Sequence, residues 1–311
     1  MIEELPEPLD GERADRVVAM LTGVSRSVAV RAIEADLVWV DDVAVDKPSQ
    51  RLRAGEQIRV DDSILEPDPA PAADPSVDVS IVFSDDDVVV IDKAPGMVVH
   101  PGAGNPSGTV VNGVLALFPE VADVGQRDRP GIVHRLDKGT SGVFVVARSA
   151  RAYDSLSSQL QDRTVERRYL TLGWGQAESD RGVIDAPLGR AVRDPTRFVV
   201  RQDGKVARTS YKVMARWDDP SVTLFECTLE TGRTHQIRVH LEAIKHPVVG
   251  DYRYGPGREP LGIERPALHA ADLGFIHPVS GEAMRFQSPL PSDFSELIDR
   301  LGTPAEGDFR S

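Results

Sequence analysis

A run of nine residues near the middle of the chain brings together side chains that could do chemistry. It reads HRLDKGTSG at residues 134–142 and lies between two apolar segments, 131–133 and 143–146. A carboxylate such as Asp137 between strand-like apolar segments must be buried with a partner or placed in a cleft, because burying it alone costs several kcal/mol. The run therefore indicates a functional site. Taken by itself, it is also compatible with a solvated turn that contains an internal salt bridge.

Other motifs that would indicate a cofactor or a metal are incomplete. The glycine-rich segment 102–108 lacks the G-x-G-x-x-G spacing, and Pro106 would interrupt the helix start that binds pyrophosphate. Lys205 follows a glycine but precedes a valine, so it is not the lysine of a P-loop. His235 and His240 are five residues apart, with neither an H-E-x-x-H motif nor a cysteine pair beside them. We therefore expect no metal and no cofactor.

The elements that must position the run fall into two domains. Residues 1–61 are predicted to form a small α/β domain, and residues 62–79 are rich in proline, acidic residues and alanine and are predicted to be a linker. Residues 80–311 are predicted to form the catalytic domain. In the N-terminal domain, apolar spacing predicts helices over 14–21 and 25–35, the second capped by Ser25, and strands over 38–40, 43–45 and 55–60.

The longer domain is predicted to be α+β. Its strands and helices occur in mixed order without regular βαβ alternation, which favours a largely antiparallel mixed sheet flanked by helices. The predicted strands are 88–91, 143–147, 168–173, 210–215 and 222–229, and the predicted helices are 109–117, 150–161 and 234–244.

Composition places the protein in a reducing compartment and does not exclude an RNA substrate. The single cysteine, Cys227, rules out a disulfide framework, and neither a signal peptide nor a membrane span is recognisable, so we expect a cytoplasmic protein. The formal net charge is -13, but residues 1–100 hold 22 acidic and 9 basic residues, whereas residues 101–311 hold 27 of each. An acidic segment repels phosphates over about 8–10 Å, so a basic cleft elsewhere is unaffected.

Four strings in this chain resemble the RluA-type family of RNA pseudouridine synthases. HRLD and TSG within 134–142 are similar to the catalytic signature of that family. The other three strings are KAPGMVVHP at 93–101, RRYL at 167–170 and LETGRTHQIRVHL at 229–241. All four strings occur along the chain in the family's order. The resemblance covers residues 84–290 and implies the pseudouridine synthase fold. Residue 167 is an arginine where the family often has a lysine.

The N-terminal segment resembles the S4 RNA-binding domain, in which a helix pair is followed by small strands. Asp41-Asp42 stands where that family usually has a tight Asn-Gly turn. With this domain, the chain looks most like the RluD-like subgroup, which modifies 23S rRNA. The resemblance implies phosphate contacts from the basic residues Arg13, Arg16, Arg26, Arg31, Arg51 and Arg53.

The resemblance also implies roles for individual residues. Asp137 would be the nucleophile, and Tyr169 would lie against the target base. Arg233 would pair with Asp137 and favour its ionised form. Attack at C1′, attack at C6 and formation of a glycal all stay open. Arg135 would fill the space left by a flipped-out uridine. The remaining RNA contacts would come from His134, Arg167, His235, Arg238, Arg13 and Arg26.

The expected activity is therefore the isomerisation of specific uridines in RNA, without a cofactor or a metal. Helix 69 of 23S rRNA is the expected target, in the free RNA or in a large-subunit precursor. Other 23S sites, or a tRNA, would require the same chemistry. A catalytically silent RNA-binding factor for ribosome assembly is an alternative from another class, and loss of the nucleophile or its partner would favour it.

Overall fold

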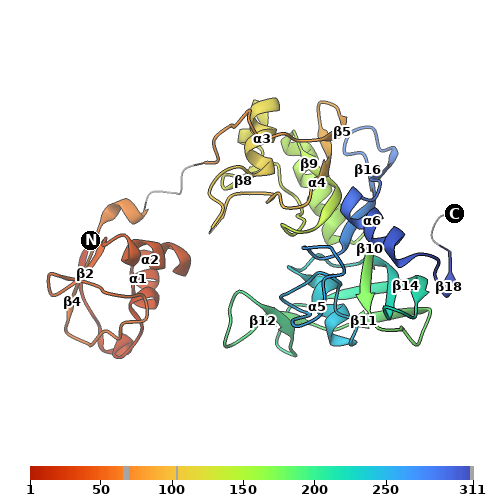
Figure 1. Cartoon of the computed structure of the whole chain (residues 1–311). Coiled ribbons are helices and arrows are strands. Elements are labelled where there is room, and N and C mark those ends of the chain that lie inside the picture. The colour runs from red at the N-terminus through yellow and green to blue at the C-terminus, as the bar shows by residue number, and fades with distance from the viewer. Residues whose placement is uncertain (66–69, 103, 309–311) are drawn as a thin grey trace. The chain divides into compact units, whose positions relative to one another are not determined.

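The computed structural model describes residues 1–65, 70–102 and 104–308, which divide into two compact units, Met1–Pro69 and Ala70–Ser311 (Figure 1). Each unit has its own hydrophobic core. Within the described residues, no helix is long and apolar enough to cross a membrane.

The N-terminal unit packs two short helices against a four-stranded antiparallel sheet with the order β1-β4-β2-β3. Ser25 caps the second helix, because its hydroxyl accepts a hydrogen bond from the Val28 N–H at 3.3 Å. The elements are β1 (Ile2–Glu4), a 3-10 turn (Glu7–Leu9), α1 (Ala14–Thr22), α2 (Arg26–Glu34), β2 (Val38–Val40), β3 (Val43–Ala44), β4 (Gln57–Val60) and a second 3-10 turn (Asp62–Leu65).

Two aspartates form the tight turn between β2 and β3. Asp41 and Asp42 have φ values of 48° and 64°, so both adopt the left-handed conformation that a two-residue hairpin turn requires. Asparagine and aspartate tolerate this conformation better than most residues. The Asp41 carboxylate also accepts the Gln57 N–H at 3.0 Å, which ties the turn to β4. The departure from Asn-Gly therefore preserves the hairpin.

The larger unit is built on a ten-stranded, mostly antiparallel sheet, and the predicted α+β class is confirmed. Its main path is β11-β14-β15-β10-β16-β9-β6-β5, with β17 beside β16 and β18 beside β14. The strands of this sheet are β5 (Ile81–Ser84), β6 (Val88–Lys93), β9 (Ser141–Ala147), β10 (Glu166–Trp174), β11 (Arg181–Asp185), β14 (Arg208–Trp217), β15 (Val222–Leu229), β16 (Leu268–Ile276), β17 (Ala283–Gln287) and β18 (Glu306–Gly307).

Helices and two small hairpins complete this unit (Figure 1). The apolar residues of β9 are buried throughout, as expected for a strand covered on both faces. Ser149 caps the helix after β9 by accepting the Ala152 N–H at 3.2 Å. The remaining elements are α3 (Val110–Leu117), a 3-10 helix (Pro119–Asp123), α4 (Ala150–Gln161), α5 (Gln236–Ala243), α6 (Ser292–Leu301), and the hairpins β7 (Gly125–Gln126) with β8 (Arg129–Pro130) and β12 (Leu188–Arg190) with β13 (Phe198–Val200).

Both ends of the predicted linker belong to folded units. Ile64 is buried in the core of the N-terminal unit, whereas Val79 is buried in the core of the larger one. Asn112 on α3 donates its side-chain N–H to the Ala72 carbonyl at 2.7 Å. The segment 62–79, which was expected to be extended, is therefore packed at both ends, because Ile64 and Val79 are buried in the two hydrophobic cores. Residues 66–69 lie outside the described residues.

The centre of the large sheet is the place where β9, β16 and β10 meet. Tyr169 of β10 pairs with Ala270 of β16, and Ala270 pairs with Gly142 of β9. The β9–β16 pairing is parallel and all others in this sheet are antiparallel. The run at 134–142 therefore leads directly into the central strands, next to the strand that carries Tyr169.

Only glycine fits at position 142. Its φ is 110°, and a Cβ atom there would lie 2.2 Å from the backbone oxygen of Ala270. We expect Gly142→Ala to lower the free energy of unfolding by about 3 kcal/mol or more, measured by chemical denaturation. Gly281→Ala is the matched control, because Gly281 also has positive φ but has open space around it. It should cost about 1–2 kcal/mol. Equal losses in the two variants would contradict this steric explanation.

Candidate active site

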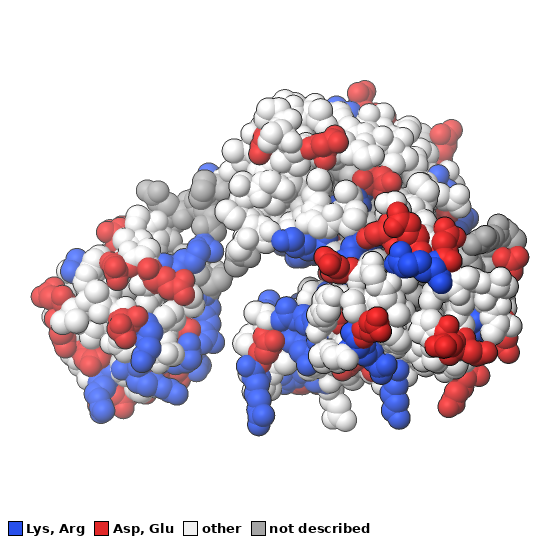
Figure 2. Space-filling view, viewed as in Figure 1, with Lys and Arg blue, Asp and Glu red and all other residues white. Residues whose placement is uncertain are grey.

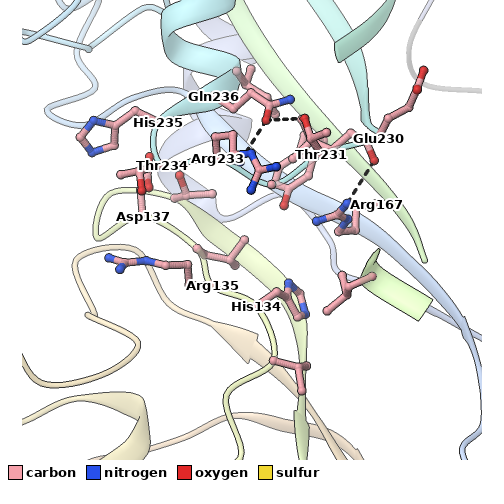
Figure 3. A pocket seen from close by; sticks show the side chains of 18 of the residues that line it. His134, Arg135, Asp137, Arg167, Glu230, Thr231, Arg233, Thr234, His235 and Gln236 are labelled. Carbon is pink, nitrogen blue, oxygen red and sulfur yellow. Dashed lines mark hydrogen bonds between the residues drawn. The ribbon is translucent and has the colours of Figure 1, made fainter. Parts of the chain in front are cut away.

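All of the functional residues predicted in the larger unit except Arg238 line one pocket of about 520 Å³. The pocket is lined by the loop before β9, by the start of β10, by the C-terminal end of α4 and by the loop between β15 and α5. Figure 3 shows Asp137 and His235 at one side of this view, Arg167 at the other side, and His134 and Arg135 below. Segments far apart in the sequence are thus brought together at the centre of the sheet.

Asp137 lies in a loop that is fixed by its own backbone. The Thr140 N–H donates to the Asp137 carbonyl at 3.0 Å, which closes a turn directly before β9. The carboxylate is 17% exposed, so it is accessible from the pocket but largely removed from water. The carboxylate thus lies partly buried at the pocket and not in a fully solvated turn.

Arg238, not Arg233, forms the ion pair with this carboxylate. Its Nη1 donates to Oδ2 of Asp137 at 3.2 Å, while its Nε and Nη2 bind the two oxygens of Asp251 at 2.5 and 2.9 Å. Arg238 is 8% exposed and Asp251 is 3% exposed. Asp251 therefore fixes the guanidinium in one orientation, with one nitrogen directed at Asp137. The neighbouring carboxylates also raise the pKa of Arg238.

The expected pairing of Arg233 with Asp137 is thus corrected. Arg233 precedes α5, lines the pocket and donates its Nε–H to the Val206 carbonyl at 3.0 Å. Arg238 lies within α5, whose first turn follows the left-handed residue His235 (φ 58°). The motif contains two arginines, and only the position of the helix start decides which of them faces Asp137.

Gln236 holds the loop between β15 and α5 in place. Its side-chain oxygen accepts the Thr231 hydroxyl at 2.8 Å and the Arg233 N–H at 3.0 Å. Its side-chain nitrogen donates to the Arg208 carbonyl and to the Thr209 hydroxyl, both at 3.0 Å. The buried amide therefore connects β14 to the loop that lines the pocket.

A buried lysine, Lys93, binds backbone carbonyls of the loop that carries Asp137 and of the preceding string. Lys93 is 1% exposed, and its ammonium donates to the carbonyls of Ala94 and Met97 at 2.9 Å and of Lys138 at 3.3 Å. These three bonds use all of its donors. Burial lowers the pKa of Lys93 to about 7, and the charge of Asp137 opposes that shift. The upstream string at 93–101 is therefore tied to the residue that follows Asp137.

Tyr169 is buried at the pocket wall, 6% exposed. A bulge in the pairing of β10 with β16 falls between Arg168 and Tyr169, and bulges change the direction of the side chains beside them. Burial raises the pKa of Tyr169 to about 12, with a smaller contribution from Asp137, whereas Arg167 lowers it. The phenol is therefore neutral at physiological pH, so in the resting enzyme it is not a phenolate base.

His134 has a structural contact that the sequence did not predict. Its Nε2 accepts the Val145 N–H at 3.1 Å, so the ring is neutral with its proton on Nδ1, and it packs edge-on against Phe144. Burial and the charge of Arg167 lower the pKa of His134 to about 3. The side chain thus fastens the start of the motif to β9, although it also lines the pocket.

Arg135 and His235 lie at the pocket, each with a neighbour outside its own motif. Nη1 of Arg135 is 3.1 Å from Nε2 of His100, whose Nδ1 is 2.9 Å from the Pro101 carbonyl. Nδ1 of His235 is 2.8 Å from the Tyr254 hydroxyl. Arg135 is exposed and lines the pocket, so its guanidinium lies at the pocket mouth.

The pocket is basic although the chain is acidic. It is lined by five arginines (Arg129, Arg135, Arg163, Arg167 and Arg233) and two carboxylates (Asp137 and Glu230). Figure 2 shows basic side chains on both sides of a hollow in the larger unit. This local excess of positive charge favours the approach of a nucleic-acid backbone.

In the N-terminal unit, Arg13 and Arg26 share one buried carboxylate. Asp15 is 2% exposed and binds Nε and Nη2 of Arg13 at 3.1 and 2.9 Å, and Nη2 of Arg26 at 3.0 Å. Both arginines remain partly exposed. Asp15, which the sequence analysis did not single out, therefore holds two guanidinium groups beside one another at the surface.

Comparison with known protein families identifies the class of enzyme to which this fold and this pocket belong. Residues 87–243 match the family model described as RNA pseudouridylate synthase, and residues 12–58 match the S4 domain. The chain therefore belongs to the RNA pseudouridylate synthase family and is an RNA pseudouridine synthase with an S4 domain.

Curated relatives match nearly the whole chain. The chain is 44% identical to the ribosomal large subunit pseudouridine synthase D of Nitrosomonas europaea, over 96% of this chain and 86% of that protein. It is 42% identical to an uncharacterised RNA pseudouridine synthase of Bacillus subtilis, over 95% of this chain and 96% of that protein.

Solved structures resemble the larger part of the chain. Human RNA pseudouridylate synthase domain containing 1 has a TM-score of 0.54 and 26% identity, covering 75% of this chain and 97% of that one. Human RNA pseudouridylate synthase domain containing 4 has a TM-score of 0.58 and 24% identity, covering 74% of this chain and 95% of that one. The second likeness concerns the fold alone, and it is the fold that the sequence predicted.

Proposed function

We propose that this enzyme isomerises uridines of 23S rRNA to pseudouridine, with Asp137 as the nucleophile. The observation that carries the proposal is the Asp137 carboxylate in the pocket, bound by Arg238, which Asp251 holds from the other side. A nearby fixed guanidinium favours the ionised form that a nucleophile needs. The reaction breaks the N1–C1′ bond and joins the ribose to C5, and this isomerisation needs no redox partner or group donor.

Tyr169 and Arg135 have complementary parts in binding the uridine. The target nucleotide must leave its stack, which costs a few kcal/mol. The buried Tyr169 ring offers a surface against which the flipped base can stack. Arg135 is exposed at the pocket mouth, where its flat guanidinium can occupy the space left in the RNA.

The proposed substrate follows from the relatives and from the S4 domain. Several relatives with 39–44% identity are named ribosomal large subunit pseudouridine synthase D. Within 23S rRNA, or a large-subunit precursor, we propose helix 69 as the site, and the cytoplasm as the place of action. Other 23S positions or a tRNA would be served by the same pocket. A silent assembly factor is disfavoured because Asp137, Tyr169 and Arg238 are all present.

Mapping pseudouridine across total RNA from a deletion strain tests the choice of substrate. We expect the loss of specific 23S modifications, restored by the wild-type gene and not by a gene that encodes Asp137→Asn. Loss at tRNA positions instead would move the substrate to tRNA. An unchanged map would contradict the proposed activity on these RNAs.

The N-terminal unit is proposed to anchor the RNA. Removing residues 1–69, rather than 1–79, keeps Val79 in the catalytic core and should leave a folded enzyme. Because the partly exposed guanidinium groups of Arg13 and Arg26 would be lost, we expect weaker RNA affinity and a shallower slope of log affinity against log salt. Single-turnover rates at saturating RNA should stay close to those of the full chain. Unchanged or higher affinity would show that the unit is not an anchor.

A further inference from the structure

Arg167 carries a buried charge that has no counter-charge in the described protein. It is 6% exposed, its Nε has no hydrogen-bond partner, and its Nη2 reaches only the Leu229 carbonyl at 3.4 Å. Burial lowers the pKa of Arg167. A buried cation without a partner is unfavourable, so its position calls for a reason outside the stability of the free protein.

Other arginines with an unbonded, buried Nε are paired in a way that Arg167 is not. Each of them lies within 4.0 Å of a carboxylate in the described residues. These arginines are Arg168, Arg197, Arg208 and Arg253. Arg168 is the most instructive, because it is the next residue of β10 and binds Asp272 at 2.7 Å. Of these two neighbouring arginines, the one at the pocket lacks the carboxylate.

Arg167 faces the pocket, and the residues around it leave space for its guanidinium. Arg167 and Tyr169 both line the pocket, and the charge of Arg167 affects the pKa values of Tyr169 and His134. Gly232 leaves room for the guanidinium, because a Cβ atom at that position would lie 2.8 Å from Nη1 of Arg167. In Figure 3, Arg167 lies across the pocket from Asp137. A nucleotide that presents its ribose to Asp137 can therefore extend its base toward Arg167.

Two electron-rich parts of a uridine nucleotide could bind such a cation: the phosphate and the uracil ring. A phosphate stays with the RNA backbone at the mouth of a pocket, whereas a flipped base enters it. A side chain that is 94% removed from solvent can reach only a group that enters, and in this pocket that group is the base. The geometry therefore favours the uracil ring.

We propose that Arg167 is a catalytic residue that stabilises the negative charge developing on the uracil during isomerisation. This inference rests on the proposed function of the pocket. When the N1–C1′ bond breaks, its electron pair stays on the uracil, spread over N1 and the ring oxygens. Attack at C6 would instead place the charge on the ring as an enolate. Any bond that Asp137 forms to C1′ or to C6 breaks again before release. C5 bonds to C1′, the C5 proton leaves and N1 gains a proton, so atoms and charge balance without a further reactant.

A fixed cation at this charge should act mainly on the rate. With a 23S rRNA transcript as the probe, we expect Arg167→Met to lower the single-turnover rate constant at saturating RNA by about 100-fold or more. RNA affinity and its salt slope should stay near those of the wild type. Thermal unfolding of the free variant should occur at the wild-type midpoint or above, because the variant removes an unpaired buried charge.

Arg168→Met is the matched control, one residue along the same strand. It removes a guanidinium that is paired with Asp272 and Glu226, so it should lower the unfolding midpoint and leave the rate constant nearly unchanged. Gly232→Ala gives a second approach if Arg167→Met does not fold. Its new methyl group displaces the guanidinium, so we expect a smaller loss of rate with affinity kept.

Three outcomes would overturn the inference. One is a wild-type rate constant in Arg167→Met. Another is an unchanged rate with weaker binding and a salt slope reduced by about 1, which would make Arg167 a phosphate contact. The third is a rate loss accompanied by an unfolding midpoint below that of Arg168→Met, which would make it a structural residue. Conversion of the same transcript by wild type but not by Asp137→Asn would leave the proposed function standing in each case.

Discussion

Replacing Asp137 with Asn should abolish pseudouridine formation, lowering the single-turnover rate constant by at least roughly 10⁴-fold. The amide has nearly the same shape as the carboxylate but is a poor nucleophile. The bonds from Arg238 to Asp251 do not involve Asp137, so the fold and the RNA affinity should be retained. The measurement is pseudouridine content of a 23S rRNA transcript after incubation with purified variant.

Two further variants make this test decisive. Asp137→Ala excludes turnover that arises from slow deamidation of the introduced asparagine. Asp154→Asn is the matched control, because Asp154 is exposed on α4 and outside the pocket lining, and it should behave as wild type. Pseudouridine formation by Asp137→Ala at a rate near that of the wild type would show that Asp137 is not the nucleophile.

Replacing Arg238 with Met should have the next largest effect, on both activity and stability. The variant removes the ion pair with Asp137 and leaves buried Asp251 without its guanidinium. We expect a loss of about 3–5 kcal/mol in the free energy of unfolding. The rate constant should fall by about 10²–10³-fold. Single-turnover kinetics and chemical denaturation report the two effects separately.

The double variant Arg238→Met/Asp251→Asn separates chemistry from folding. It removes both buried charges, so it should regain much of the stability that Arg238→Met loses but none of the activity. Arg233→Met is the companion variant in the same motif and should be far less damaging, because among the described residues the Arg233 side chain bonds only the Val206 carbonyl. If Arg238→Met is more active than Arg233→Met, then Arg233, and not Arg238, pairs with Asp137 in the RNA-bound enzyme.

Much of this architecture is predictable because local pattern and long-range packing agree. The buried strand β9 follows a continuous apolar run, and α2 and α4 begin after serines that cap them. Asp137, Tyr169 and Arg233, which come from three different strings, line one pocket. Strand β16 was not predicted, because buried His269 and Asp272 interrupt its apolar pattern.

The partners of the predicted residues could not be derived from spacing. Asp251 lies outside the four strings, and only the tertiary fold brings it to Arg238. Lys93 begins one of the strings, but its sequence gives no sign that its ammonium binds the carbonyl of Lys138. The exchange of Arg233 for Arg238 has the same cause, because the starting residue of a short helix decides which side chains face the pocket.

The position of β16 has a consequence for how the enzyme matures. This strand follows β9 and β10 in the chain but lies between them in the sheet, where it connects β5, β6 and β9 to β10, β15, β14 and β11. During synthesis, Asp137 and Tyr169 leave the ribosome on two partial sheets whose facing edges have no partner. Such open edges are sites of mispairing until the missing strand arrives. We therefore expect the pocket to be complete only after β16 has joined the two partial sheets.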